Sequence, residues 1–337
     1  MAALATNLQH LVDQARTFEP TRVAVADAGQ RVVLETLRET HALGFVEPRL
    51  VGEPGAIAEL CKTIGWNVTK DWIVPVEADA TDAAVAAKAV ELARTGEADV
   101  VMKGHIHTDA LMHALLDKDQ GIRVPGRRVS HLFIVELPSH AKLLGITDAA
   151  INIAPDLNAK AQILQNAVDF FHLLGIEAPK VAVLSAVETV NPAISSTLDA
   201  ACLTLMARRG QITGTIVDGP LAFDNAISRQ AAGEKGISSP VAGDADILLV
   251  PDLVSGNILA KNLEYLGGAV ATGLALGLAA PVVLTSRADP APARLASLAL
   301  AALLHHRTAR APAKPKAAEP SPHCAPQPEY ACCPLPG

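Results

Sequence analysis

Short apolar runs alternate with amphipathic segments through the first hundred residues. The runs "RVAVADA" (22–28) and "ADVVMKG" (98–104) predict strands, and "PRLVGE" and "WIVPVE" between them predict two more. Helices predicted over 29–44 and 82–96 each end at a glycine, which readily takes the left-handed conformation of a helix C-cap. Strands and helices that alternate at this spacing predict an α/β fold with a parallel, doubly wound sheet.

The second half repeats this alternation with other connections. "SHLFIVELP" and "AKLLGITDAAIN" predict strands, and the segment 156–174 predicts a helix that ends before Gly175. One face of that helix carries Leu164, Ala167, Val168, Phe171 and Leu174. "KVAVLSA" and "ADILLVPD" predict two further strands, each followed by a polar loop. Ligands of open α/β sheets bind at the carboxyl ends of strands, so we expect these loops to meet in one site.

The stretch 266–284 has no charged residue and is long enough to span a membrane. Pro281 divides it, and Val282 to Leu284 resembles a short buried strand. We therefore predict a small-residue helix over 266–280 followed by a core strand, without membrane insertion. From residue 308 the composition becomes Ala, Pro and Lys, so 308–337 is predicted to be a disordered Pro/Ala-rich tail.

Composition and charge narrow the class of protein. Half of the 337 residues are hydrophobic but only 3% are aromatic, which suits aliphatic helices packed on a buried sheet. The net charge of −7, without a long basic block, argues against a nucleic-acid partner. Five scattered cysteines form neither a disulfide framework nor a zinc motif, and the N-terminus lacks the apolar core of a signal peptide. We expect a cytoplasmic protein.

Polar residues cluster after the predicted strands. His105 and His107 resemble metal ligands, but no acidic partner stands at a fixed spacing, so no metal is predicted. The run 195–197 fits either a helix N-cap or a phosphate site at a helix N-terminus. Of the adjacent Arg127 and Arg128, we expect one to point inward and the other outward.

Several common motifs are absent from the sequence. There is no nucleophile elbow, no Walker loop and no dinucleotide fingerprint after the first strand, which argues against serine hydrolysis and NAD binding. The remaining hydroxyl, Arg, Lys and Asp groups suit phosphate, and the apolar loops suit an acyl chain. The residues alone therefore indicate a transferase that acts on phosphate or a phosphorylated substrate.

Six stretches together resemble the phosphate acetyltransferase/phosphate butyryltransferase family. They are "KGHIHT", "RRVSH", "VNPAISSTLDAA", "DGPLAFDNAIS", "ADILLVPDLVSGNILAKNL" and "PVVLTSRAD", in this order between about residues 98 and 300. The resemblance implies the reaction acyl-CoA + phosphate = acyl phosphate + CoA, by direct attack of phosphate on the thioester. It implies CoA as a substrate, no permanently bound cofactor and no metal, and a homodimer in which the helix 266–280 could pack at the interface.

The resemblance also implies an architecture. It consists of two doubly wound α/β domains with an interdomain active-site cleft, as in the isocitrate and isopropylmalate dehydrogenases. Residues 1–137 with 282–307 would form the first domain and 138–281 the second.

Site residues follow from the matching motifs. Ser286 would stabilise the oxyanion, Arg287 would hold phosphate, and Asp289 would be the base. Acetyl-type members carry an aspartate seven residues after the serine, where this chain has Ala293. The substrate-binding candidates are Lys103, Thr108, Arg128, Ser130, His131, Asn191, Ser196, Thr197, Asp218, Gly219, Pro220, Asp224, Asp252, Gly256, Asn257 and Lys261.

The stretch "GPLAFDNA" resembles the butyryl branch of the family more than the acetyl branch, and Ala222 would leave room for a longer acyl chain. Asp218-Gly219-Pro220 is expected to end a central strand at the cleft, with Leu221–Phe223 as apolar cleft or packing surface. Asp224 is expected to face the loops that carry Lys261 and Arg287. Two other functions remain open. One is a metal- and NAD-dependent decarboxylating dehydrogenase of similar fold, and the other is a non-catalytic CoA-binding protein.

Overall fold

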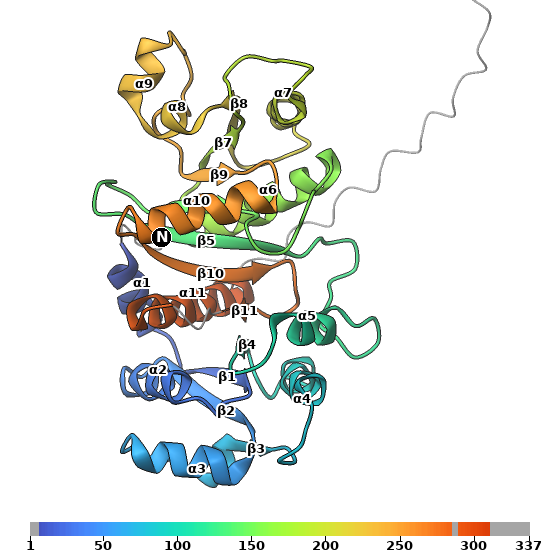
Figure 1. Ribbon diagram of the computed structural model, residues 1–337, viewed down its shortest axis with the longest axis vertical. Helices are drawn as coiled ribbons and strands as arrows, with labels where there is room; N and C mark the ends of the chain where they lie inside the picture. Colours follow the sequence, from blue (N-terminus) through green and yellow to red (C-terminus); the bar gives the residue numbers. More distant parts are fainter. Residues whose placement is uncertain (1–6, 285–288, 311–337) are drawn as a thin grey trace, which may run out of the picture.

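One continuous mixed sheet runs the length of the molecule (Figure 1). The computed structural model describes residues 7–284 and 289–310. The strands are β1 (Thr21–Ala26), β2 (Val46–Gly52), β3 (Ile73–Pro75), β4 (Val100–Lys103), β5 (Ser130–Glu136), β6 (Leu144–Thr147), β7 (Lys180–Leu184), β8 (Ile216–Leu221), β9 (Ile247–Leu249), β10 (Val270–Leu276) and β11 (Val282–Val283). Their order across the sheet is β3-β2-β1-β4-β11-β10-β5-β6-β9-β7-β8.

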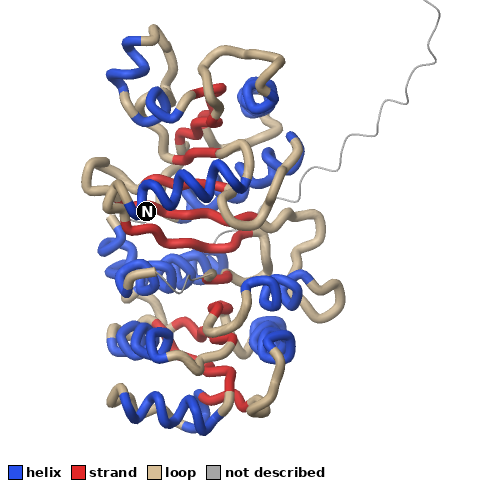
Figure 2. Tube along the Cα trace, viewed as in Figure 1, coloured by secondary structure: helices blue, strands red, loops and turns tan. Residues whose placement is uncertain are grey.

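Helices cover the sheet and connect its strands. They are α1 (Leu8–Ala15), α2 (Arg31–Ala42), α3 (Pro54–Thr63), α4 (Asp82–Arg94), α5 (Thr108–Leu116), α6 (Leu157–Leu173), α7 (Ser195–Arg208), α8 (Phe223–Ile227), α9 (Arg229–Glu234), α10 (Leu253–Tyr265) and α11 (Ala291–Arg310). Figure 2 shows helices on both sides of the strands in the lower half of the molecule, which explains why β1 and β4 are almost entirely buried.

The predicted elements of the first half are confirmed. β3, β2, β1 and β4 are parallel neighbours, with α2, α3 and α4 between them in sequence. Thr81 caps α4 by accepting a hydrogen bond from the amide of Ala84. Gly44 and Gly96 follow α2 and α4 with φ of 85° and 78°, the left-handed conformation expected after a helix. Local sequence signals therefore placed these elements correctly.

The prediction of a parallel sheet is wrong in the middle of the sheet. β10 pairs antiparallel with both β11 and β5, and β5 pairs antiparallel with β6. Beyond β6, the strands β9, β7 and β8 are again parallel to one another. The two halves of the sheet consequently run in opposite directions, which a local sequence pattern does not encode.

The predicted helix over 266–280 is also wrong, because its middle, Val270–Leu276, forms the central strand β10. At Gly273, an added Cβ would lie 2.7 Å from the His131 ring on β5, so the glycine reflects a close neighbour across the sheet. Burial between two paired strands accounts for the lack of charge in this stretch. The core strand predicted at Val282 is confirmed as β11. Within 7–284 and 289–310, no helix is long and apolar enough to cross a membrane.

The helix predicted over 156–174 is confirmed as α6, which Asp156 caps by accepting from the amide of Ala159 at 2.7 Å. Asp218-Gly219-Pro220 does not end a central strand as predicted. It lies inside β8, which is the last strand of the sheet. Leu221 is the final residue of β8 and is buried against its neighbours. α11 packs against α1, α2 and β10 and extends to Arg310, so the chain is helical beyond the predicted start of the tail, and 311–337 lies outside the described residues.

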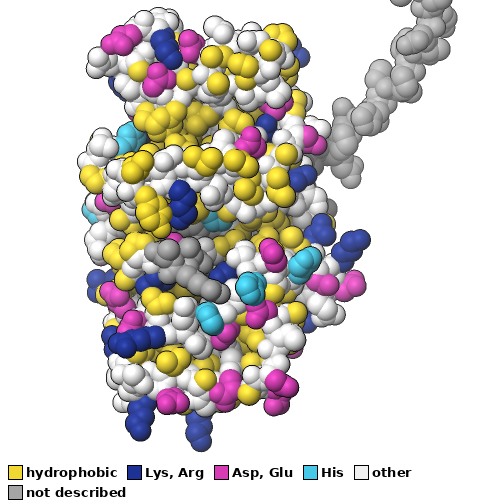
Figure 3. Space-filling view, in the orientation of Figure 1, with side chains coloured by type: hydrophobic (Ala, Val, Ile, Leu, Met, Phe, Trp, Pro, Cys, Tyr) yellow, Lys and Arg dark blue, Asp and Glu magenta, His cyan; other side chains and the backbone are white. Residues whose placement is uncertain are grey.

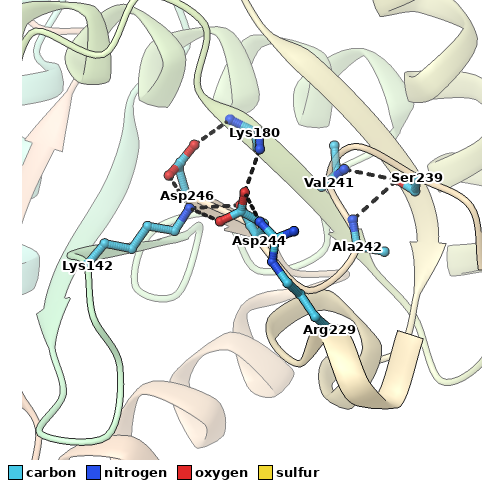
Figure 4. Close-up of polar contacts among 8 residues, drawn as sticks. All are labelled: Lys142, Lys180, Arg229, Ser239, Val241, Ala242, Asp244 and Asp246. Carbon is cyan, nitrogen blue, oxygen red and sulfur yellow. Dashed lines mark hydrogen bonds and ion pairs between the residues drawn. The ribbon is translucent and has the colours of Figure 1, made fainter. Parts of the chain in front are cut away.

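A group of ion pairs joins the amino ends of β6, β7 and β9 (Figure 4). The carboxylate of Asp244 lies 3.0 Å from Lys142 Nζ, 2.5 Å from Lys180 Nζ and 2.9 Å from Arg229 Nη2. Asp246 accepts from Lys142 Nζ at 2.6 Å and from the backbone amide of Lys180 at 2.8 Å. These contacts tie three strands and α9 together at one end.

Candidate functional site

The direction of the strands divides the predicted polar clusters into two groups. β4, β11 and β5 run one way, whereas β6, β7, β8 and β9 run the other way. The carboxyl ends of β4 and β11 therefore lie at the opposite edge of the sheet from those of β6 to β9. Because a sheet also twists by roughly 20–25° per strand, the ends of distant strands are placed in space by twist as well as by pairing direction, and the expectation that all strand-end loops meet in one site stays a prediction. Each group has to be assessed by itself.

The first group surrounds the carboxyl ends of β1 and β4. The amide of His105 donates to Asp27 O at 2.9 Å, and His105 Nδ1 lies 3.7 Å from the Asp27 carboxylate. Asp27 has a φ of 60°, a conformation that aspartate tolerates better than most residues. Gly104 is required here because a Cβ would overlap the carbonyl oxygen of Asp27. Lys103 is buried immediately before this turn.

α5 begins beside this turn. The amide of His107 donates to Asp82 at 2.8 Å, and Thr108 is exposed in the first turn of the helix. Figure 3 shows histidine side chains gathered over the start of α5. No cluster of His, Cys, Asp or Glu within the described ranges is arranged to hold a metal ion.

α10 brings a further candidate to the same edge. The helix starts after β9 at the other edge and runs back about 20 Å, since each helical residue rises ~1.5 Å. Its Lys261 Nζ lies 2.8 Å from Glu264 and 5.5 Å from the centre of the Tyr265 ring. Partial burial disfavours the charged form of Lys261, but the hydrogen bond with Glu264 and the nearby charge of Asp289 outweigh it and raise its pKa.

Asp289 thus lies close to Lys261, and it also lies close to Arg294 of α11. The Arg294 guanidinium donates to the carbonyl oxygen of Asp289, and its Nε donates to Thr36 Oγ1 at 3.0 Å. Burial lowers the pKa of Arg294, although the charges of Asp289 and Glu35 oppose this. Asp289, which follows β11, therefore accepts from Arg294 through its backbone carbonyl oxygen and acts on Lys261 through its charge. Arg294 was not a predicted site residue, although it lies next to Ala293 in the sequence.

The other two catalytic candidates, Ser286 and Arg287, lie outside the described residues. They belong to the segment 285–288, which joins β11 to Asp289. Ala293, which stands where acetyl-type members have aspartate, is buried in the first turn of α11 and its carbonyl accepts from Ser297. Lys261 and Asp289 are the two sequence-predicted residues near this edge that the structure relates to each other, through the effect of the Asp289 charge on Lys261.

A second set of candidates lies at the start of β5, where Ser130 and His131 are both fully buried. Asp148 accepts hydrogen bonds from the amides of His131, Ala150 and Ile151 at 2.9–3.0 Å. Burial lowers the pKa of His131 to about 4, although the charge of Asp148 works in the opposite direction. Within the described ranges, His131 Nδ1 has no hydrogen-bond partner.

Two asparagines hold the arginine pair that precedes β5. Arg128 Nη1 donates to Asn152 at 3.1 Å, and Arg127 Nη2 donates to Asn166 at 3.2 Å. The two arginines reach different partners, but both remain exposed, so the expected inward and outward pair is not observed. Asp148, Asn152 and Asn166 were missed in the sequence. Asp148 follows a predicted strand directly, the signal that identified the other candidates.

The loop after β7 uses its hydroxyl groups for its own structure. Thr197 is fully buried, accepts from the amide of Asn191 at 2.9 Å and contacts the Asn191 carbonyl oxygen at 2.8 Å. Ser196 Oγ lies 2.8 Å from Ser185 Oγ. The N-cap of α7 is Ile194 and has no side-chain cap, so neither hydroxyl caps the helix from the N-cap position. This geometry favours a structural role for Thr197 over direct substrate contact.

The remaining candidates lie on β8, α8 and α10. Gly219 packs against β7, because a Cβ there would lie 2.7 Å from the carbonyl oxygen of Val183. Asp224 lies 3.2 Å from Lys235, and its expected position facing the loops that carry Lys261 and Arg287 stays a prediction. Six strand-to-strand steps of ~4.8 Å, roughly 29 Å, separate β8 from β11 along the sheet.

Asp218 and Pro220 share β8 with Gly219, and Pro220 is buried. At the start of α10, Asp252 is the N-cap and accepts from Ser255 N at 2.8 Å. Gly256 allows close packing on Ala149, and Asn257 donates to the carbonyl oxygen of Ala149 at 3.3 Å. These contacts position α10, and through it Lys261.

Comparison with known sequences agrees with the family suggested by the motifs. The family model described as phosphate acetyl/butaryl transferase matches residues 75–302. The phosphate acetyltransferase of Rhizobium meliloti is 48% identical over 301 residues, covering 89% of this chain and 94% of that protein. The phosphate butyryltransferase of Clostridium acetobutylicum is 42% identical over 298 residues, covering 88% and 98%. The chain belongs to the phosphate acetyl/butyryl transferase family and is an acyltransferase.

Solved structures show the same fold. A branched-chain phosphotransacylase from Enterococcus faecalis V583 matches with a TM-score of 0.73 and 32% identity, covering 85% of this chain and 99% of that one. A 4-hydroxythreonine-4-phosphate dehydrogenase from Klebsiella pneumoniae shares the fold at a TM-score of 0.51 and 11% identity, covering 85% of this chain and 98% of that one. The predicted α/β class is confirmed, with a large mixed sheet, while the finer likeness to isocitrate dehydrogenase stays a prediction.

Proposed function

We propose that this protein transfers a short acyl group between CoA and inorganic phosphate: acyl-CoA + phosphate = acyl phosphate + CoA. The family match across residues 75–302 carries this proposal. The charged group formed by Lys261, Asp289 and Arg294 supports it, because phosphate and a departing thiolate both need cations nearby. No bound cofactor is required for this reaction.

Each catalytic candidate has a chemical task in this reaction. Arg287 would align phosphate through its planar guanidinium, and Ser286 would donate to the oxyanion formed when phosphate attacks the thioester carbonyl. The tetrahedral intermediate would then collapse and release CoA thiolate. In the reverse direction Asp289 would remove the proton of the CoA thiol. Lys103, Thr108 and the remaining candidates near this edge would bind substrate.

The acyl group is proposed to be acetyl, propionyl or butyryl. Relatives named phosphate acetyltransferase range from 48% down to 39% identity, and those named phosphate butyryltransferase reach 42%, so identity does not separate the branches. Each buried methylene contributes about 0.8 kcal/mol, enough for a modest preference among short chains. Ala222 follows the edge strand β8. For Ala222 to select the length of the acyl chain, the acyl-CoA site would have to be completed by another part of the molecule or by another subunit that reaches this edge strand.

The division into domains 1–137 with 282–307 and 138–281 stays our proposal, with an active-site cleft between them. The pairing of β11 with β4, and the packing of α11 on α1 and α2, support the return of the chain to the first half. A homodimer is also proposed. Its interface cannot be the predicted helix 266–280, and the exposed apolar residues Val254, Ile258 and Tyr265 of α10 offer a more suitable surface.

A cytoplasmic location is proposed on the free thiols Cys61 and Cys202. Of the alternative functions, the decarboxylating dehydrogenase rests on likeness of fold alone, because the 4-hydroxythreonine-4-phosphate dehydrogenase from Klebsiella pneumoniae is only 11% identical to this chain. A non-catalytic CoA-binding protein would retain the fold and lack the base.

One assay tests the proposal against these alternatives. The protein is incubated with butyryl-CoA and phosphate, without added metal or NAD, and free thiol is measured. We expect phosphate-dependent release, and its absence with acetyl-, propionyl- and butyryl-CoA alike would exclude the acyltransferase. Arg287→Ala is expected to raise the Michaelis constant for phosphate, and an unchanged constant would exclude its assigned role.

Asp289→Asn tests the base. We expect the rate of acyl-CoA formation from acyl phosphate and CoA to fall by about 10²-fold or more, the usual effect of losing a general base. Asp13→Asn is the matched control because Asp13 is an exposed residue of α1, and its rate should stay within twofold. Equal rates in the two variants would remove Asp289 from the mechanism.

A further inference from the structure

A cavity of about 670 Å³ lies away from the proposed site. Its walls come from α6, from the turn 277–281 that joins β10 to β11, and from the end of α11. The turn precedes β11, whereas Asp289 follows it, so the cavity and the charged group lie toward opposite ends of the same strand. The volume is typical of sites for small organic ligands, ~300–1,000 Å³.

Most of the cavity wall is apolar. Phe170 and Leu173 of α6 line it on one side, Leu276 at the end of β10 and Leu278 in the turn on another, and Leu304 of α11 on a third. Such a lining favours the hydrocarbon part of a ligand, since burying apolar surface is the main favourable contribution to its binding.

One arginine supplies the charge. Arg127 lines the cavity, and its Nη2 donates to Asn166 at 3.2 Å and to Asp169 at 3.1 Å. A guanidinium has five N–H donors, so the donors on Nε and Nη1 remain for a ligand; within the described ranges they have no hydrogen-bond partner. The side chain is 47% exposed and is held in place by these two contacts.

The balance of charge selects the kind of anion. Asp169 stands beside Arg127 and offsets part of its charge, so a dianion such as a phosphate ester would be repelled more than a single carboxylate. His172 also lines the cavity, and its Nε2 donates to the carbonyl oxygen of Gly214 at 2.7 Å. We propose that this cavity binds a small monocarboxylic acid, with its carboxylate on Arg127 and its hydrocarbon chain against the leucines and Phe170.

The position of the cavity gives its ligand a route to the catalytic residues. The turn 277–281 leads directly into β11, which pairs with β4 beside Met102, one residue before Lys103. A ligand that holds this turn in one position therefore changes the population of positions that β11 adopts beside β4 and Lys103. This kinetic consequence rests on the proposed function, whereas binding to the cavity does not.

Binding is tested with hexanoate by calorimetry on the full-length protein at pH 7, without CoA or phosphate. We expect saturable binding that Arg127→Met weakens at least tenfold and that Leu278→Trp abolishes by filling the cavity. Arg209→Met is the matched control, because Arg209 is an exposed residue at the end of α7 outside the cavity. Absence of binding, or equal binding to wild type and Leu278→Trp, would overturn the proposal.

Two further measurements separate charge and regulation. Hexylamine, with the same chain and the opposite charge, should bind at least tenfold more weakly than hexanoate, and equal affinity would refute the role of Arg127. Saturating hexanoate should change kcat of thiol release at least twofold in the wild type and not in Leu278→Trp. Binding without any change in kcat would refute the coupling through β11, and a protein without acyltransferase activity that still binds hexanoate would refute the proposed function alone.

Discussion

Replacing Asp244 with asparagine tests how much the ion pairs at the amino ends of β6, β7 and β9 stabilise the fold. Partial burial disfavours ionisation of Asp244, but hydrogen bonds from Lys180 and Lys142 outweigh it and lower its pKa from 3.8 to about 2. At ~1.36 kcal/mol per pKa unit this corresponds to roughly 2.4 kcal/mol. The side chain is 26% exposed, and solvent screening reduces the expected loss to about 1–2 kcal/mol.

The sign of the pH dependence follows from the lowered pKa. Protonated Asp244 is disfavoured in the folded state, so the stabilisation is complete above about pH 5 and is lost as the pH falls from about 4 toward 2. Asp244→Asn should therefore lower the free energy of unfolding at pH 7, and the difference from wild type should shrink as the pH approaches 3. Urea unfolding followed by circular dichroism at pH 7, 5, 4 and 3 measures both quantities.

Glu91→Gln is the matched control for this experiment, because its pair with Lys88 is much more exposed, at 44% and 39%. Exposed pairs one helical turn apart contribute about 0.2–0.5 kcal/mol, so the control should stay near wild type. An Asp244→Asn variant as stable as this control at pH 7, or a difference that does not change between pH 7 and 3, would refute the electrostatic reasoning.

Three other predictions follow from particular contacts. Gly104→Ala should lower the free energy of unfolding by about 1–3 kcal/mol through overlap with Asp27, whereas Gly233→Ala, with open space around it, should be neutral or stabilising in the same urea titration. Ile258→Arg should convert a dimer to a monomer in light scattering; an unchanged mass would exclude the α10 face. The wild type should lose stability as the pH falls from 6.5 to 4, because burial lowers the pKa of His131 and the unfolded state therefore takes up the proton first. His131→Gln should remove this loss. A wild type whose stability does not fall over this range would contradict the prediction.

Part of the candidate site could be predicted from the rule that polar residues follow strands. Lys261 and Asp289 were proposed from their motifs, and the structure brings them together. Asp224 was expected to face the loops that carry Lys261 and Arg287; it pairs with Lys235, and its position relative to those loops stays a prediction. A motif identifies the chemistry of a residue, but the distance between two motifs depends on strand order.

Arg294 was missed for a related reason. It lies on a helix whose sequence resembles an ordinary apolar core helix, and only the packing of α11 beside Thr36 and Asp289 shows its position. Asp148 was overlooked although it directly follows a strand, because the stretch "TDAAIN" had been interpreted as part of that strand.

The sequence by itself determined the local elements with strong signals. Periodic apolar residues and an N-cap at Asp156 defined α6, and glycines at 44 and 96 ended two helices, because these preferences act between residues close in the chain. Tertiary structure alone decided the direction of β5 and β6 and turned 270–276 into a central strand. Hydrogen bonds between distant strands stabilise that arrangement, and the sequence of one segment does not specify which distant strand will pair with it or in which direction.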